Sequence, residues 1–211
     1  MLLFPPAMDD GIKNDFPDKS SKNLLFSNIR KHVDLGADEE NLVLCFFNVT
    51  LRPRKTLFLQ QGNLCRRFYF VQQGSVRAFH TNLEGKESTI MFAVEDWWIT
   101  DMGAFLNEQA ASISLETLDD SLLFEIDSEA LEKMLFTLPK MEKYFRILYQ
   151  RAYVREQQRV LDAISCPVEE RYLRFLEKYP KIVKKITQKQ IASYLGVTPE
   201  FLSTVKNRIG S

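Results

Sequence analysis

Apolar and polar positions change their spacing along the chain, and the middle third has a strand-like pattern. Between Val49 and Asp127 the apolar runs are short and rich in β-branched and aromatic residues, with turn signals such as Gln73-Gly74 and Glu84-Gly85 between them. Short runs at roughly ten-residue spacing predict an antiparallel roll or barrel. The predicted strands are VTLR, KTLFLQ, RFYFVQ, SVRAFHT, STIMFAV, SISLETL and SLLFEID.

Helical patterns stand on both sides of this strand region. We expect short helices over Leu24–Val33 and Ser128–Leu138, and another over DEENLVLCFF, which Asp38 caps. Residues 1–22 combine prolines with a polar run, which predicts a flexible leader without a function of its own.

A long uninterrupted helix is predicted over Lys140–Ile164, which holds neither glycine nor proline. Its apolar residues form two stripes, one of Met141, Phe145, Leu148 and Ala152, the other of Ile147, Val154, Leu161 and Ile164. Two stripes suggest that the helix contacts its own roll on one side and a second subunit on the other. The alternative is a helix packed only within its own chain.

The stretch Ile186–Ile209, ITQKQIASYLGVTPEFLSTVKNRI, predicts two short helices joined by a tight turn. Thr187 and Gln190 have capping-box spacing, and Gly196 can take the positive φ that ends a helix. Thr198 can cap the second helix, with Pro199 at its first position. The apolar face is made by Ile191, Ala192, Leu195, Leu202 and Val205. The whole set is typical of a helix-turn-helix, although a purely structural helical hairpin needs the same apolar spacing.

Polar residues of this stretch are candidates for contacting double-stranded DNA. Short polar side chains on a recognition helix suit base edges in a major groove. We therefore expect base contacts from Glu200, Ser203, Thr204 and Asn207. Phosphate contacts are expected from Lys189, Lys206, Arg208 and the cap Thr187, and we add Gln188 and Thr198 to the candidate DNA-binding residues. Phe201 can touch a thymine methyl group or pack inward, and we favour packing.

The charge distribution supports contact with phosphate at one end of the chain. The formal net charge is zero, but the segment from Arg171 onward has nine basic residues and only two acidic ones, Glu177 and Glu200. The tail thus carries +7 and the preceding chain −7, which suits nucleic-acid binding by the tail. The longest apolar run, Leu42–Phe47, is too short to cross a bilayer, so no membrane contact is expected. Without a convincing secretion signal, we expect a cytoplasmic protein.

Cysteine and histidine are too few to suggest metal chemistry. Cys45, Cys65 and Cys166 are widely spaced, and only His32 and His80 are present. Zinc and four-thiolate iron–sulfur sites need closer thiol groupings, and a cupin-like metal enzyme needs clustered ligands. We therefore expect no metal, no haem, no iron–sulfur cluster and no enzymatic activity, with His80 solvated or hydrogen-bonded.

Taken together, these segments resemble the Crp–Fnr family of bacterial transcription regulators from about Leu24 to the end. The markers are FYFVQQGSVRAF, EGKE at Glu84–Glu87, Asp96 before the aromatic pair, the long helix and ITQKQIASYLGVTPEFLS. The resemblance implies an α+β fold: an antiparallel β-roll (a double-stranded β-helix, like cyclic-nucleotide-binding domains) over 23–138, a dimerisation helix over 139–165, and a helix-turn-helix domain over 166–211. It implies a homodimer, joined through Lys140–Ile164, whose roll senses a ligand and repositions the DNA-reading helices. RNA polymerase is a further candidate partner.

Departures from the family pattern concern the ligand. Cyclic-nucleotide-binding members carry a Gly-Glu pair and later an Arg-Ser pair, whose Arg neutralises the phosphate. Here Ile99 and Thr100 take the first place, and Ala110 or Ala111 takes that of the Arg. Since a buried phosphate needs a charged partner, we expect no tight binding of cyclic AMP. The candidate pocket consists of Trp97, Trp98, Thr100, Asp101, Gln109 and Ser112; it either binds a different small-molecule effector or is filled by its own side chains.

The other departures concern the tail. Family members commonly continue into a β-hairpin wing, whereas this sequence stops at Ser211, and Thr204 stands nearest the slot of the usual guanine-reading Arg. Glu200 matches the family's acidic position. We therefore expect a DNA-binding transcription regulator with an operator preference of its own. The alternative is a ligand-sensing module that contacts a protein partner and binds DNA weakly or not specifically.

Overall fold

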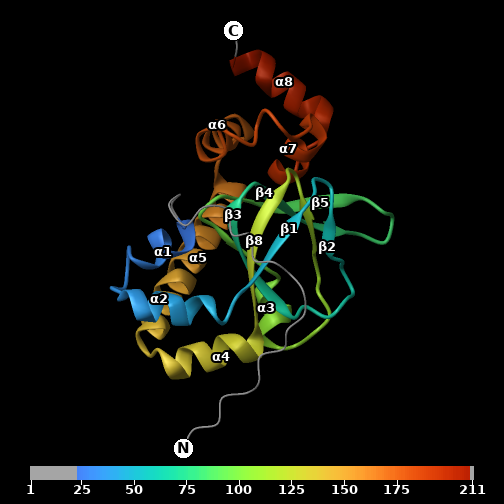
Figure 1. The fold of residues 1–211 in the computed structure, drawn as a ribbon. Coiled ribbons are helices and arrows are strands. Elements are labelled where there is room, and N and C mark those ends of the chain that lie inside the picture. The colour runs from blue at the N-terminus through green and yellow to red at the C-terminus, as the bar shows by residue number, and fades with distance from the viewer. Residues whose placement is uncertain (1–22, 210–211) are drawn as a thin grey trace, which may run out of the picture.

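Two four-stranded antiparallel sheets form a roll in the computed structural model, which describes residues 23–209 (Figure 1). The predicted leader over 1–22 lies outside the described residues. One sheet has the order β1 (Asn48–Arg52), β8 (Ser121–Asp127), β3 (Arg67–Gln73), β6 (Trp98–Ile99). The other has the order β2 (Leu57–Leu59), β7 (Ser114–Thr117), β4 (Ser75–Thr81), β5 (Glu87–Val94). All seven predicted strands are confirmed, and β6 was not predicted.

The inner residues of both sheets bury a core of aliphatic and aromatic side chains. Phe70 lies opposite Phe124 and Val71 opposite Leu123 in the β3–β8 pair, and Phe70, Val71 and Leu123 are fully buried. The turn between β3 and β4 needs Gly74, which has a φ of 91°. A Cβ atom there would lie 2.4 Å from Ser121 Oγ, so a larger residue would push β8 away.

Eight helices are found among the described residues. They are α1 (Leu24–Ile29), α2 (Ala37–Leu44), α3 (Met102–Leu106), α4 (Ser128–Thr137), α5 (Lys140–Ser165), α6 (Val168–Lys178), α7 (Gln188–Leu195) and α8 (Pro199–Ile209).

Two sequence predictions about the first helices were wrong in detail. Helix α1 ends at Ile29 rather than Val33, because the amides of Lys31 and His32 bond to carbonyls three residues back, as in a turn. The N-cap of α2 is Gly36, whose amide donates to Glu39 Oε2 at 2.8 Å, and Asp38 lies inside the first turn. The short helix α3 had not been predicted.

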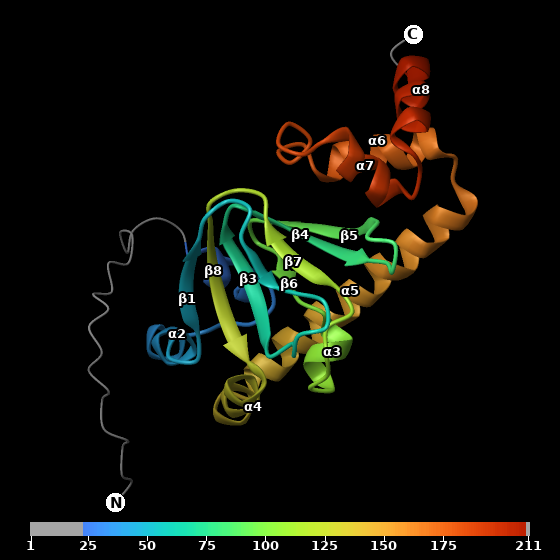
Figure 2. The same ribbon diagram turned by 90° about the vertical axis from the view of Figure 1, so that its right-hand side faces the viewer.

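Helix α5 joins the roll to the C-terminal helices (Figure 2). Its first half packs on the roll, where Met141, Tyr144 and Phe145 are buried. Its second half runs past the roll and leads into α6, α7 and α8, the C-terminal module. This module has its own apolar cluster, which Phe92 and Leu118 of the roll complete.

Candidate nucleic-acid interface

Helix α7, the first of the two helices predicted over Ile186–Ile209, begins and ends as its sequence predicts. Thr187 Oγ1 accepts a hydrogen bond from the amide of Gln190, and the Gln190 side chain accepts one from the amide of Thr187. Gly196 ends α7 with a φ of 69°. Ala192 is fully buried, which lets α7 and α8 approach closely. The helix-turn-helix geometry is therefore confirmed.

The second helix also follows the prediction. Helix α8 begins at Pro199, and Thr198 Oγ1 accepts a hydrogen bond from the amide of Phe201 at 3.2 Å. Leu202 and Val205 are fully buried against the rest of the module. This anchoring fixes which side of α8 faces outward.

The outward side of α8 carries the residues predicted to contact bases, which are Glu200, Ser203, Thr204 and Asn207. All four are exposed on one solvent-facing surface, which we name the reading face. The Ser203 and Thr204 hydroxyls donate to carbonyls of their own helix, at 3.1 and 3.3 Å, and both residues are exposed. Phe201 is 43% exposed, so the inward packing favoured from the sequence is wrong.

The residues predicted to contact phosphate lie in two places. Thr187, Gln188 and Lys189 are exposed at the start of α7. Thr187 and Lys189 line a groove of about 290 Å³ together with the β4–β5 hairpin, which adds Lys86. At the end of α8, Arg208 pairs with Glu169 at 3.3 Å. Of the other predicted residues, Lys206 is partly buried and Thr198 is exposed.

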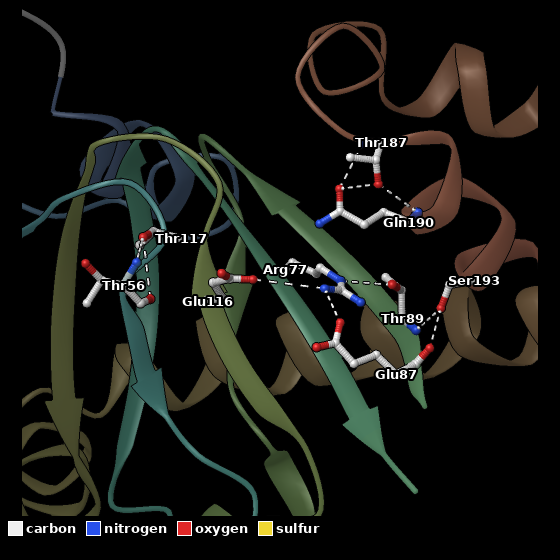
Figure 3. A network of polar contacts seen from close by, with 9 residues as sticks. All are labelled: Thr56, Arg77, Glu87, Thr89, Glu116, Thr117, Thr187, Gln190 and Ser193. Carbon is white, nitrogen blue, oxygen red and sulfur yellow. Dashed lines mark hydrogen bonds and ion pairs between the residues drawn. The ribbon is translucent and has the colours of Figure 1, made fainter. Parts of the chain in front are cut away.

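Polar contacts join α7 to the roll through β5 (Figure 3). Ser193 Oγ accepts from the amide of Thr89 at 2.8 Å and donates to the carbonyl of Glu87 at 3.0 Å. From inside the roll, the guanidinium of Arg77 reaches the Thr89 hydroxyl at 2.9 Å and the Glu87 carboxylate at 2.8 Å. Only 4% of Arg77 is exposed. These contacts were not predicted from the sequence, because they join residues far apart in the chain.

An aromatic cluster supports the same contact. The ring of Phe92 on β5 lies 5.7 Å from that of Tyr179 and 6.0 Å from that of Phe175. Tyr194 of α7 lies 5.1 Å from Phe175 and 5.7 Å from Phe92. Burial raises the pKa of both Tyr179 and Tyr194, so both stay neutral and add no charge to the interface.

Two ion pairs lie at the edge of this interface. Lys185 of the module approaches Asp119 of the roll at 2.8 Å, and Lys181 approaches Glu95 at 3.8 Å. Burial opposes ionisation of Asp119, but hydrogen bonds from Lys185 and Ser75 outweigh it and lower the pKa of the carboxyl group. Because both pairs are partly exposed, each contributes less than the aromatic cluster.

The candidate ligand pocket brings some of its predicted residues together. Asp101 Oδ2 accepts from both the amide and the hydroxyl of Ser112, each at 2.7 Å, and Asp101 Oδ1 accepts from the amide of Ala104. Thr100 lies 3.2 Å from Cys65 Sγ, and the amide of Cys65 donates to the Gln109 carbonyl. Burial opposes ionisation of Asp101, but the hydrogen bonds from Ser112 and Ala104 prevail and lower its pKa.

The two tryptophans of the predicted pocket point to different places. Trp98 lies in the core between β3 and α5, with its ring 4.6 Å from Phe68 and its Nε1 donating to Tyr144 at 2.7 Å. Trp97 instead lies 5.9 Å from the ring of Tyr179 in the C-terminal module. Neither joins the polar cluster around Asp101. Because neighbouring side chains in extended backbone point to opposite faces, the adjacent positions of Trp97 and Trp98 already indicate that the two rings separate.

Most of the second apolar stripe of α5 is left exposed by residues 23–209 of its own chain. Val154, Leu161 and Ile164 are 61%, 55% and 81% exposed, and Val160 is exposed beside them. Ile147, nearer the roll, is half-buried. The alternative that α5 packs only within its own chain would leave this stripe in contact with solvent.

Other sequence expectations concern metals and membranes. His80 Nδ1 lies 2.8 Å from the carbonyl of Ser112, as expected for a hydrogen-bonded histidine. Over residues 23–209 no three histidine, cysteine or acidic side chains are grouped as a metal site would require. None of the helices in that range is both long and apolar enough for a membrane span.

Comparisons with known proteins find a similar domain, a similar sequence and similar structures. Residues 49–137 match the cyclic nucleotide-binding domain. The chain is 27% identical over 178 residues to the cyclic AMP receptor protein of Thermus thermophilus, covering 81% of each. It resembles the crystal structure of the catabolite activator protein of the same organism, with 26% identity, a TM-score of 0.54 and coverage of 83% and 84%. A transcriptional regulator of the Crp–Fnr family from Eubacterium rectale has the same fold, with 17% identity, a TM-score of 0.66 and 84% coverage of both chains.

Proposed function

We propose that this chain, a transcription regulator of the Crp–Fnr family, binds double-stranded DNA by inserting α8 into the major groove. The observation that carries the proposal is the reading face of α8, which is anchored from behind by Leu202 and Val205 and open in front. Glu200 can accept from the exocyclic amine of cytosine, and Phe201 can contact a thymine methyl group. Ser203, Thr204 and Asn207 would contact neighbouring base edges.

Phosphate contacts would hold α8 in register with the duplex. Lys189 and the Thr187 cap stand at the start of α7, while Lys206 and Arg208 stand near the end of α8. Cations placed on both sides of a recognition helix can reach phosphates on both strands that border the groove. Gln188 and Thr198, both exposed, would add neutral donors.

The active form we propose is a homodimer joined through α5. The exposed stripe contains Val154, Val160, Leu161 and Ile164, in which Leu161 follows Val154 by seven residues and Ile164 follows Leu161 by three, a spacing that a coiled-coil seam uses. Pairing along this seam would bury it and place two copies of α8 on one face of the dimer. Two-fold symmetry then predicts two half-sites about 34 Å apart, which is one turn of DNA.

The small-molecule effector of the roll would not be cyclic AMP. Ile99 is buried where a cyclic-nucleotide-binding member presents its Gly-Glu pair, and Ala111 is buried in the region of the phosphate-binding Arg. Asp101 adds a carboxylate there, with a lowered pKa, which would repel a phosphate. Any effector in this place would contact Thr100, Asp101, Gln109 and Ser112. Calorimetry should show no micromolar binding of cyclic AMP, and a micromolar constant would contradict this part of the proposal.

The direct experiment is selection of bound duplexes from a random pool by the full chain. The proposal predicts enrichment of a two-fold symmetric sequence, and repeating the selection with small molecules from a cell extract tests whether an effector is needed. If no sequence is enriched under either condition, the alternative function as a protein-contacting module is favoured. RNA polymerase, bound near the selected site in the cytoplasm, is the further partner we propose.

A further inference from the structure

A cleft of about 750 Å³ lies between the roll and the C-terminal module, away from the Asp101 cluster. Four elements form its walls: β5, the second half of α5, α6 and the end of α7. Its apolar part comes from Phe175, Tyr194 and Leu195, and Ser88 and Thr89 add polar groups from the roll. The volume lies within the usual range of small-molecule sites, about 300–1,000 Å³.

Positive charge dominates this interdomain cleft. Its lining includes five cations, Arg155, Arg159, Arg171, Arg174 and Lys178, and a single acid, Asp162. Arg174 pairs with Asp162 at 2.5 Å and with Glu170 at 2.6 Å, which uses up the acid of the cleft. Arg159 pairs with Glu156 at 2.8 Å.

Three of the five cations have no carboxylate partner within residues 23–209: Arg155, Arg171 and Lys178. Arg171 donates from Nη1 to the carbonyl of Leu195 at 2.8 Å. Its Nε is buried, and the described residues supply no acceptor for it. A buried donor without an acceptor is unfavourable, so an acceptor from a bound molecule would relieve that cost.

Arg155 and Lys178 each contact the same aromatic ring, that of Trp97. Arg155 Cζ lies 5.2 Å and Lys178 Nζ 5.4 Å from the centre of the Trp97 ring. Burial lowers the pKa of Lys178, and the like charges of Arg155 and Arg159 lower it further. The negative face of the ring offsets this repulsion only in part, so the pair favours an anion nearby.

We propose that this interdomain cleft binds a small phosphate-bearing anion, free or as part of a nucleotide, through Arg155, Arg171 and Lys178. Arginine and lysine side chains grouped around one space are suited to several phosphate oxygens. The apolar wall of Phe175, Tyr194 and Leu195 would take the ring of a nucleotide. The site is separate from the hydrogen-bonded residues around Asp101 in the roll, and its binding does not depend on the proposed contact with DNA.

Occupancy of the interdomain cleft would strengthen the docking of the module onto the roll. Thr89 already bonds to Ser193 across the interface, and the anion would add bridges between α5 and α6 beside that contact. A ligand that binds one arrangement better than another shifts the population toward it. The anion would therefore act as a second input to the reading face.

The test is calorimetric titration of the full chain with ATP, pyrophosphate and adenosine at about 0.1 M salt, where exposed charges are screened beyond about 10 Å. We expect ATP or pyrophosphate to bind and adenosine to be at least tenfold weaker, since a charged hydrogen-bond pair contributes about 1.5–3 kcal/mol, or roughly tenfold or more. Binding of both phosphates alike identifies the phosphate itself as the ligand, and preference for ATP identifies a nucleotide. Adenosine binding as tightly as ATP, or no binding of either phosphate, would overturn the proposal.

Variants locate the site. The double change Arg155→Gln and Lys178→Gln should lower the affinity for ATP and pyrophosphate by about tenfold or more. The matched control is Lys143→Gln with Lys184→Gln, which removes the same charge at exposed positions outside the cleft and should change affinity by less than about twofold, within the usual effect of surface changes. Arg155→Gln alone, on an exposed part of α5, serves if the double variant melts early. Equal affinity in the cleft variants and the control would place the anion elsewhere and contradict the proposal.

Discussion

The Asp101 cluster of the roll and the reading face of α8 use their polar side chains in opposite ways. In the roll, the Asp101 carboxylate accepts three hydrogen bonds from Ser112 and Ala104, so its capacity is used inside the chain. On α8, the Ser203 and Thr204 hydroxyls bond to their own helix and stay exposed beside Glu200.

This difference indicates which region can contact another molecule without first breaking its own hydrogen bonds. Paired polar groups must break existing bonds before they bind a ligand, whereas exposed hydroxyls exchange only water. The reading face is therefore available as it stands, while a ligand of the Asp101 cluster would have to rearrange it.

The largest effect is expected from breaking the proposed seam. Leu161→Asp with Ile164→Asp should give a monomer and reduce affinity for a symmetric duplex by at least about a hundredfold, because the linked second half-site is lost. Sedimentation and fluorescence anisotropy measure the two effects. Phe136→Asp, at a 90% exposed position of α4, is the control and should change neither. A monomer that keeps full affinity would refute the dimeric reader.

Asp101→Asn should lower stability by about 1–3 kcal/mol, because the new amide turns a donor toward the Ser112 amide and hydroxyl. The depressed pKa of Asp101 means that its contribution is present above the unfolded value, about 3.9, and is lost as pH falls through the lower folded value. Chemical denaturation measures the loss. DNA affinity of the folded variant should stay unchanged. A loss of DNA affinity with unchanged stability would contradict the view that Asp101 acts within the roll alone.

Glu200→Ala should change DNA recognition while leaving stability almost unchanged, the reverse of Asp101→Asn. Stability should change by about 0.5 kcal/mol, the effect of an exposed carboxylate near a helix N-terminus. Base preference at one position of the half-site should relax by about 1–3 kcal/mol. Binding to single-base variants of the selected duplex measures this change. An unchanged preference at every position would show that Glu200 does not face the bases.

Lys189→Ala should weaken all duplexes alike and reduce the steepness of the salt dependence by about one phosphate contact per subunit. Lys143→Ala removes the same charge from an exposed position of α5 and should leave both quantities unaltered. If Lys189→Ala matches this control, the placement of α7 against the phosphates is wrong.

The smallest effect is expected where the reading face is tied to the roll. Ser193→Ala removes the acceptor of the Thr89 amide and the donor to the Glu87 carbonyl, and should cost about 1 kcal/mol. Hydrogen exchange of the Thr89 amide should become faster. Ser203→Ala, which loses only a bond within α8, should leave that exchange rate as it is. No change at Thr89 would mean that Ser193 does not hold the module in place.

Much of the C-terminal module was predictable because its determinants are local. The cap at Thr187, the left-handed Gly196 and the Thr198–Pro199 start are set by residues within a few positions of each other. The same local rules predicted the wrong N-cap for α2: the structure has Gly36 at this position, and the prediction was Asp38. Local propensity is easily overridden at the end of a short helix.

Contacts between distant residues could not be predicted from the sequence. Arg77 lies in a predicted strand with no local signal of its role, yet it is buried and holds the β5 residues that contact Ser193. Phe92 likewise completes the core of the C-terminal module from the other domain. Their roles depend on which surfaces meet, and one sequence does not specify that before the fold is known.

The most direct test of DNA reading is the salt dependence of binding to the selected duplex. With Lys189, Lys206 and Arg208 from each of two subunits, the logarithm of affinity should fall with the logarithm of salt concentration with a slope of about −5. Fluorescence anisotropy over a range of salt concentrations gives this slope. A slope near that value would support a paired reader, whereas no measurable binding, or binding insensitive to salt, would contradict the account.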